Sequence, residues 1–378
     1  MTVAEGADDD ELIAMLRQSI ERYTAEHYTF EGRWAALKSP RAYSEQAWSD
    51  YGHFGWLALR LPQESGGVAA GVRTTAPLME AVGARLLLEP ILASAIVGTG
   101  LILRRASADQ KAQLLPKLAD GTLKVAFAHQ ETLNAFSEDA ISSEYRGGAV
   151  HGSKVAVLHA DCANRLIVSA RKRDVGGTVS LYIVDAVARG LRRQRFRLLD
   201  GRGAANLSFD GVEAEPLNAS GAIDADQAAI AAALEEAIVA SCSEALGAIR
   251  ALNAATNQYL KSRKQFGRPI GANQALQHRM VEMHLLEQEV RALTLAAQRA
   301  LSELEVGRTR IISGARAFTC SAARRIAAEA VQMHGGIGVS DELDVSHYYR
   351  RLMVLGTLFG NRECHFGRFA ATCEAIGH

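Results

Sequence analysis

The stretch RKQFGRPIGANQALQH, residues 263–278, decides how the rest of the chain is interpreted. It lies between two long helix-forming segments, and Gly267, Pro269 and Gly271 interrupt the helical pattern between them. Arg263 carries a planar set of donors that fits a phosphate group. From these residues alone, a plain helix–loop–helix with a basic elbow is as well supported as a ligand site.

The composition predicts a soluble globular protein. Its 378 residues suffice for two or three domains, and 48% of them are apolar. Lysine plus arginine equal aspartate plus glutamate at 42 each, which argues against nucleic acid or an anionic membrane as a partner. Five cysteines without a C-x-x-C pair indicate neither a disulfide framework nor a zinc site. Because the N-terminus lacks a signal-peptide core and no apolar run is long enough to span a bilayer, we expect a cytoplasmic protein.

Helical patterns fill both ends of the chain, and short apolar runs of strand length fill its middle. Turn dipeptides separate these runs at 147–148, 176–177 and 210–211. No long helix intervenes between them, so we expect an antiparallel sheet or small barrel. The expected domains are an N-terminal helical domain (1–121), a middle β domain (122–222) and a C-terminal helical bundle (223–378).

Several segments resemble the acyl-CoA dehydrogenase family. They are RKQFG (263–267), GWLALRLPQESGG (55–67), VAFAHQE (125–131), LLDGRGAANLSFDGV (198–212) and VQMHGGIGVSDE (331–342). The resemblance covers about residues 45–370. It implies a mainly α fold with an N-terminal helical domain, a β-barrel-like middle domain and a C-terminal four-helix bundle. SEALGA, QALQHRMVEM and SLYIVDA look most like the small subunit of pimeloyl-CoA dehydrogenase and related heteromeric bacterial enzymes.

The resemblance implies that the chain binds flavin adenine dinucleotide (FAD). A guanidinium can pair with the FAD pyrophosphate, and glycines let backbone amides approach a cofactor closely. Read without the family, the glycine motif is an ordinary helix C-cap and turn. The implied cofactor-binding residues, some acting across a subunit interface, are Arg263, Gln265, Phe266, Gln274, Gln332, Gly335 and Gly336.

The catalytic base of the family is missing from both places where the resemblance puts it. In the family, a glutamate removes the α-proton of an acyl-CoA thioester, and burial raises its pKa for that task. Phe359 occupies the usual position, and Ala237 occupies the alternative position early in the long helix. Glu244 lies two helical turns further on. It either lines a pocket as a substitute base or belongs to a structural polar network, and the catalytic residue stays unknown.

The strand that contacts the flavin ring also departs from the family. The usual Trp-Ile-Thr-Asn reads Val157 to Ala160 here. Glu131 and Ser137 remain as weak candidates for flavin contacts, and we interpret His129 and His159 as structural.

These losses favour a heteromeric enzyme, an α2β2 tetramer whose sister subunit supplies the glutamate and the flavin-ring site. Two alternatives remain: a homo-oligomer that uses Glu244 as its base, or a flavin-free scaffold subunit. The implied partners are an acyl-CoA substrate, the sister subunit and an electron-transferring flavoprotein. No metal site is expected.

Overall fold

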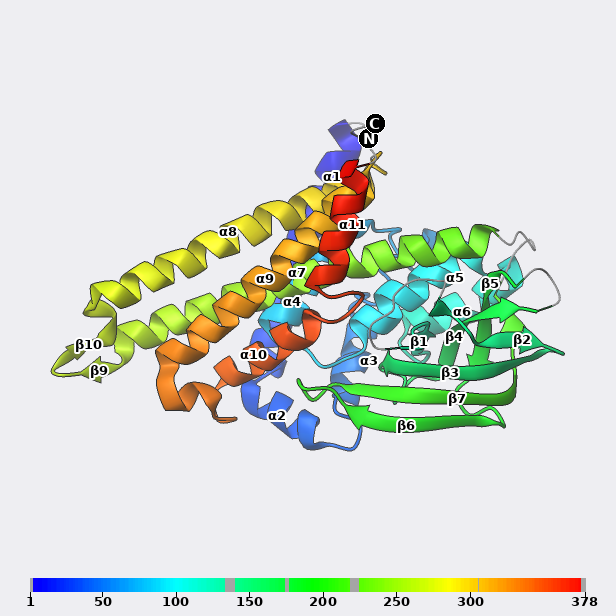
Figure 1. The fold of residues 1–378 in the computed structure, drawn as a ribbon, viewed down its shortest axis with the longest axis horizontal. Coiled ribbons are helices and arrows are strands. Elements are labelled where there is room, and N and C mark those ends of the chain that lie inside the picture. Colours follow the sequence, from blue (N-terminus) through cyan, green and yellow to red (C-terminus); the bar gives the residue numbers. More distant parts are fainter. Residues whose placement is uncertain (1–2, 133–139, 174–176, 218–223, 305, 375–378) are drawn as a thin grey trace. The chain divides into compact units, whose positions relative to one another are not determined.

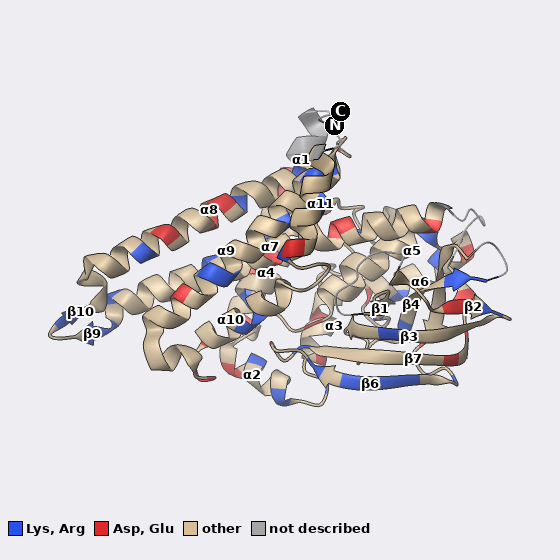
Figure 2. Ribbon diagram, viewed as in Figure 1, with Lys and Arg blue, Asp and Glu red and all other residues tan. Residues whose placement is uncertain are grey.

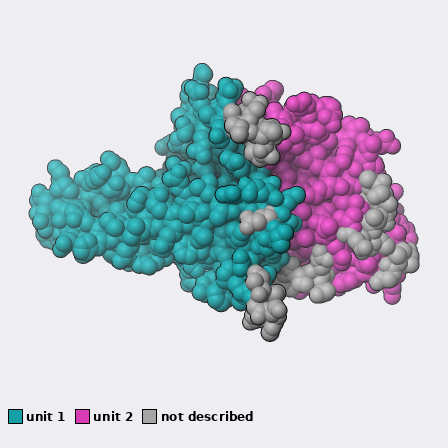
Figure 3. Space-filling model, turned by 90° about the horizontal axis from the view of Figure 1, so that it is seen from above, with its two compact units in different colours: residues 1–32, 72–87, 238–378 teal, residues 33–71, 88–237 magenta. Residues whose placement is uncertain are grey.

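The computed structural model describes residues 3–132, 140–173, 177–217, 224–304 and 306–374. They form two compact units, coloured separately in Figure 3. Unit 1 comprises residues 1–32, 72–87 and 238–378, and unit 2 comprises residues 33–71 and 88–237. The two units combine segments that are not consecutive in the sequence, so they do not test the division into three consecutive domains, which stays a prediction.

Helices account for both ends of the chain, as expected (Figure 1). The α-helices are α1 (Val3–His27), α2 (Phe30–Lys38), α3 (Glu45–His53), α4 (Val72–Ala84), α5 (Thr99–Arg105), α6 (Ala108–Ala119), α7 (Asp224–Ser262), α8 (Gln274–Ser302), α9 (Arg308–His334), α10 (Asp344–Leu355) and α11 (Arg362–Glu374). Shorter helical segments are η1 (Gln63–Ser65), the π-helix η2 (Ile91–Gly98), η4 (Ile270–Ala272) and η5 (Gly335–Val339). Local signals explain several boundaries. Ser107, for example, accepts a hydrogen bond from the backbone of Gln110 and begins α6 with a capping box.

The middle of the chain forms an eight-stranded sheet within unit 2. Its strands are β1 (Val125–Ala128), β2 (Glu144–Arg146), β3 (Ala149–Leu158), β4 (Arg165–Lys172), β5 (Val179–Asp185), β6 (Leu191–Arg197), β7 (Gly203–Glu213) and β8 (Glu215–Pro216). They follow the order β6-β7-β3-β2-β4-β5-β8, with β1 beside β4. The pairings are antiparallel except for β1–β4 and β2–β4. The expected class, mainly α with a β domain in the middle, is confirmed.

One expected turn is wrong. Asp210 and Gly211 do not separate two strands but lie inside β7, where they oppose the single residue His151 of β3 as a bulge. Gly211 has a φ of 64°, a conformation that glycine adopts readily, so a turn-forming dipeptide can serve as a bulge within a continuous strand. The turn expected at 176–177 begins outside the described residues.

Close helix packing holds the core of unit 1 together. An added Cβ at Gly83 of α4 would lie 1.8 Å from the Glu244 carbonyl oxygen of α7, and one at Gly247 would lie 1.8 Å from the Glu80 carbonyl oxygen. Each helix therefore needs a glycine where it touches the backbone of the other. Gly247 thus permits the close packing of α7 against α4.

Candidate functional site

The segment after α7 forms a β-hairpin with an exposed aromatic tip. Strands β9 (Lys264–Gln265) and β10 (Arg268–Pro269) pair antiparallel, and Phe266 and Gly267 form the turn between them. Both turn residues have positive φ, 51° and 81°, as a tight two-residue hairpin turn requires. A bulky residue in this conformation is strained. The Phe266 side chain is 102% exposed and so gains nothing from burial in its own chain.

The polar residues expected to hold the dinucleotide surround this hairpin and are exposed. The backbone of Arg263 is fixed, since its N–H donates to Tyr259 and its carbonyl accepts from Ile270. Among the described residues, its guanidinium has no hydrogen-bond or ion-pair partner. Gln265 and Gln274 are exposed as well. Figure 2 shows basic residues along the hairpin, and the sequence from 261 to 279 contains no acid to neutralise them.

The three glycines in the turn after α9 differ in whether the fold requires glycine at their positions. Gly335 ends the helix with a φ of 68°, which is the helix C-cap that its sequence predicts without the family. An added Cβ at Gly338 would lie 2.8 Å from the Val331 carbonyl oxygen. At Gly336 an added Cβ would meet nothing within 4 Å, and its φ is not positive. Gly336 and the neighbouring Gln332 are exposed, so the space beside this backbone is open.

Tyr259 connects the two motifs, and sequence reasoning missed it. Its carbonyl accepts the Arg263 N–H at 2.8 Å, and its hydroxyl donates to the His334 carbonyl at 3.3 Å. The ring stacks on the His334 ring with 4.3 Å between centroids. The structure thus brings the hairpin and the glycine turn to the same tyrosine in unit 1. A tyrosine in the last turn of a long helix gives no signal of this role.

The usual base position offers no proton acceptor. Phe359 has a φ of 57°, is half-buried, and packs against the apolar cluster that includes Ile238 and Ile312. Its carbonyl accepts a hydrogen bond from Nε2 of His365 at 2.9 Å. Burial lowers the pKa of His365 to about 4, so this histidine is neutral at physiological pH. Phe359 and His365 therefore stabilise this part of the chain, and neither is suited to remove a proton from a substrate.

The acids near the alternative position are engaged in buried ion pairs. Glu244 is completely buried and forms a bidentate pair with Arg351 of α10, at 2.7 and 2.8 Å. This geometry fits the polar-network interpretation of Glu244 and leaves it no access to a substrate. Ala237 is buried as well. Glu236, in unit 2, is bridged by Arg60 at 2.7 Å and by Arg104.

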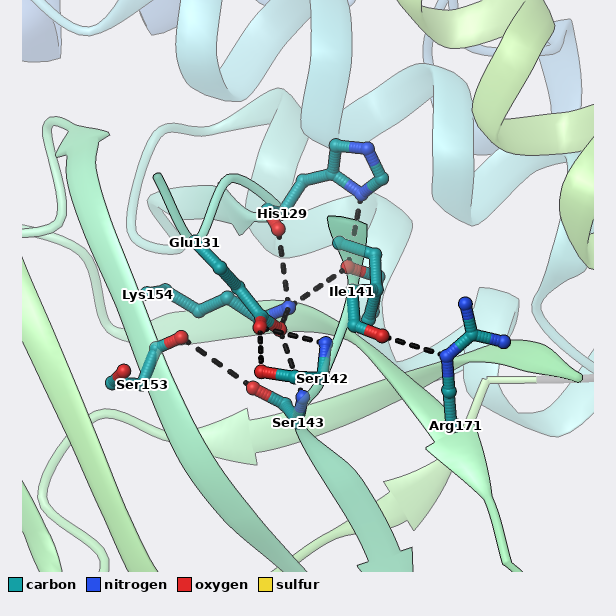
Figure 4. A network of polar contacts seen from close by, with 9 residues as sticks. His129, Glu131, Ile141, Ser142, Ser143, Ser153, Lys154 and Arg171 are labelled. Carbon is teal, nitrogen blue, oxygen red and sulfur yellow. Dashed lines mark hydrogen bonds and ion pairs between the residues drawn. The ribbon is translucent and has the colours of Figure 1, made fainter. Parts of the chain in front are cut away.

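In unit 2, the residues after β1 form a buried network (Figure 4). Nζ of Lys154 donates to Glu131 at 2.7 Å and to Ser169 at 3.3 Å, and His129 Nδ1 lies 2.9 Å from Ser169 Oγ. Glu131 also accepts hydrogen bonds from the backbones of Ser142 and Ser143. Burial alone would raise the pKa of Glu131, but the charge of Lys154 and these hydrogen bonds lower it to about 2.

Contacts within unit 2 hold both Glu131 and His129 in place, which fits the structural interpretation of His129. Burial, followed by the charge of Lys154, lowers the pKa of His129 to about 4 and keeps the imidazole neutral. The neighbouring strand β3 is irregular between Lys154 and Val157, just before the stretch that aligns with the family's Trp-Ile-Thr-Asn. Ala156 has a φ of 49°, and its N–H donates to Oδ1 of Asn206 instead of to a regular ladder. Ser137, the other candidate for a flavin contact, lies outside the described residues.

Within the described ranges, every helix is too short or too polar to traverse a lipid bilayer.

Comparison with known proteins agrees with this architecture. A model described as "Acyl-CoA dehydrogenase, N-terminal domain" matches residues 10–122, and one described as "Acyl-CoA dehydrogenase, C-terminal domain" matches residues 228–373. Together they cover more than half of the chain. The acyl-CoA dehydrogenase FadE12 of Mycobacterium tuberculosis is 28% identical over 343 residues, which is 86% of each chain.

Two solved structures show the same fold. A variant of the Tcur3481-Tcur3483 steroid ACAD aligns with a TM-score of 0.85 at 25% identity and covers 99% of each chain. The ChsE4-ChsE5 complex from Mycobacterium tuberculosis aligns with a TM-score of 0.85 at 18% identity, over 97% of this chain and 98% of that one. The chain belongs to the acyl-CoA dehydrogenase family, flavoprotein oxidoreductases that act on CH–CH bonds.

Proposed function

We propose that this chain is a subunit of a flavin-dependent acyl-CoA dehydrogenase and shares an FAD site with a sister subunit that supplies the catalytic base. The observation that carries the proposal is the hairpin. A fully exposed Phe266 lies at its tip, and the guanidinium of Arg263 at its base has no partner among the described residues. An exposed aromatic side chain in a strained turn fits a contact that forms outside the chain. A pyrophosphate is the dianionic group that a guanidinium binds through parallel hydrogen bonds.

The other implied residues extend this contact. Gln265 and Gln274 present amide groups to the adenosine half, and Gln332, Gly335 and Gly336 present an open turn to the adenine end of a neighbour's cofactor. Among the described residues, nothing packs against Gly336 closely enough to require glycine there, which supports close approach by an external group. When bound, FAD supplies the acceptor for the hydride that leaves the β-carbon of the acyl group.

The base must come from elsewhere because neither expected position carries an acid. Phe359 cannot accept a proton, and Glu244 is already occupied by Arg351. A second protein chain that carries the base explains why this chain lacks it. The similar ChsE4-ChsE5 structure is a complex, which is the kind of assembly proposed here.

The substrate class and acceptor follow from the resemblance. We propose an acyl-CoA thioester with a carboxylated or otherwise bulky acyl chain, an electron-transferring flavoprotein as acceptor, an α2β2 assembly and a cytoplasmic setting.

The test is the flavin content of the chain purified alone and co-expressed with its sister subunit, read by visible absorption and light-scattering mass. We expect yellow protein only in the heteromer. Arg263→Ala in the heteromer removes a charge-assisted contact and is expected to weaken FAD binding about 10- to 100-fold. Arg299→Ala is the matched control, since Arg299 lies on α8 and its side chain forms an exposed ion pair with Glu303, just after the helix.

Unchanged flavin affinity in Arg263→Ala contradicts the role of the hairpin. Yellow, active homo-oligomer from the chain alone contradicts the shared site. A colourless heteromer, by contrast, favours a flavin-free scaffold. Gly336→Ala refines the test, because the open space predicts unchanged folding stability together with weaker flavin binding.

A further inference from the structure

Three side chains with metal-ligand chemistry meet in unit 2, at the turn that joins β3 to β4. His159, Asp161 and Cys162 each place one ligand atom within 4.8 Å of the other two. An imidazole nitrogen, a carboxylate oxygen and a thiolate sulfur are all donors that zinc uses in proteins. The proposed flavin function uses none of these residues.

The surroundings of Asp161 are the strongest indication that this cluster binds a cation. Its side chain is 7% exposed, and Oδ1 finds no hydrogen-bond partner among the described residues. Burial raises the pKa of this carboxyl group. The fold nevertheless makes room for it: an added Cβ at Gly203 of β7 would lie 1.9 Å from Oδ2. A buried carboxylate oxygen without a partner is costly, and a cation would supply the missing partner.

The backbone of the neighbouring His159 is also in an energetically unfavourable conformation. His159 has a φ of 55°, which is unfavourable for a residue with a side chain. The Cys162 thiol donates a weak hydrogen bond to the His159 carbonyl, with 3.4 Å between sulfur and oxygen. Burial raises the pKa of this thiol to about 12.

We propose that His159, Asp161 and Cys162 bind a divalent cation of the zinc type, with a fourth position left for water or an external ligand. Zinc bonds of about 2.0–2.3 Å place tetrahedral ligand atoms about 3.5 Å apart, so the cluster contracts by about 1 Å on binding. The spacing H-x-D-C contains no cysteine pair, which explains why the sequence alone indicated no zinc site.

The charge balance of binding is defined. The Cys162 S–H bond breaks, a sulfur–metal bond forms, and the proton passes to solvent. Because a cation with two positive charges enters and one proton leaves, the cluster gains one net positive charge.

Arginines on β6 oppose this change without preventing it. Figure 2 shows β6 as a basic strand, and Arg197 lies 3.6 Å from Oδ2 of Asp161. Arg193 donates to the Ala160 carbonyl, and Arg195 also acts electrostatically on Asp161. Because the cluster gains one net positive charge, these cations weaken the site. Removing the charge of Arg195, which is exposed, is expected to tighten metal binding.

The test titrates the metal-free full-length chain with Co²⁺, a spectroscopic substitute for zinc. We expect one equivalent to produce a thiolate-to-cobalt charge-transfer band. Cys162→Ser removes the band, and Cys364→Ser, which changes another partly buried cysteine, keeps it. Calorimetry with Zn²⁺ is expected to show a single binding event with one ion per chain. Arg195→Gln is expected to bind more tightly than the parent chain.

Absence of the charge-transfer band at saturating Co²⁺, or its persistence in Cys162→Ser, overturns the proposal. If Cys162→Ser does not fold, Asp161→Asn answers the same question, because loss of one ligand must weaken Co²⁺ binding while the thiolate band stays. Unchanged affinity in Asp161→Asn also overturns it. Flavin content of the heteromer is an independent readout that these variants leave unaltered.

Discussion

Replacing Glu244 with glutamine distinguishes a structural carboxylate from a catalytic base. The side chains of Glu244 and Arg351 are 0% and 1% exposed, and two hydrogen bonds of 2.7 and 2.8 Å join them. Opposite charges about 4 Å apart attract by about 4 kcal/mol at an effective dielectric constant of about 20. Glutamine keeps the shape of the side chain but removes this counter-charge. We therefore expect the free energy of unfolding to fall by about 3–5 kcal/mol.

The assay is urea unfolding of the purified chain, followed by circular dichroism, together with turnover of the co-expressed heteromer. A double variant, Glu244→Leu with Arg351→Met, is the control. It replaces both charges with apolar groups and is expected to recover most of the lost stability, because a buried ion pair is often matched by well-packed apolar residues. If Glu244→Gln is as stable as the parent but loses turnover, Glu244 is the base and the reasoning from its ion pair is refuted.

Two further predictions test the packing and the electrostatics of each unit. Gly247→Ala puts a methyl group 1.8 Å from the Glu80 carbonyl oxygen, so α4 and α7 must separate; urea unfolding is expected to show a loss of roughly 1–3 kcal/mol, and unchanged stability would contradict the contact. Burial opposes ionisation of Glu131, but Lys154 and the surrounding hydrogen bonds lower its pKa from 4.5 to about 2. The stabilisation from this carboxylate is therefore complete above about pH 4.5 and is lost as the pH falls toward 2. The stability difference between the parent and Lys154→Met should shrink across that range, and a constant difference would exclude the pair as its cause.

Local sequence patterns predict many of the helices and strands. Residues 225–262 contain strong helix formers and no proline, which matches α7 (Asp224–Ser262), and Ser107, a residue type that caps helices, begins α6. The strand β6 was not predicted because its sequence, LRRQRFR, is polar on both faces, as an edge strand can be. The π-helix η2 gave no signal, since its continuous apolar run also fits an ordinary buried helix.

The hairpin shows a limit of a different kind. In Q-F-G-R, an aromatic residue takes the left-handed turn position that glycine or asparagine usually fills, so propensity argued against it. The long-range partners of the site were also out of reach. Glu244 pairs across 107 positions and Tyr259 across 75, and periodicity identifies the face of a helix but not the element opposite.

The contacts of Gly83 and Gly247 constrain the order in which the chain can fold during synthesis. Helix α4 leaves the ribosome early, but the backbone it packs against lies in the second half of α7. Unit 2 is interleaved with unit 1 along the chain and ends at Ala237, so its last residues emerge before the C-terminal bundle exists. In a nascent chain, α4 therefore cannot pack against α7 until translation has passed Gly247. Until then, the apolar residues that α4 buries in the folded unit stay without that packing partner.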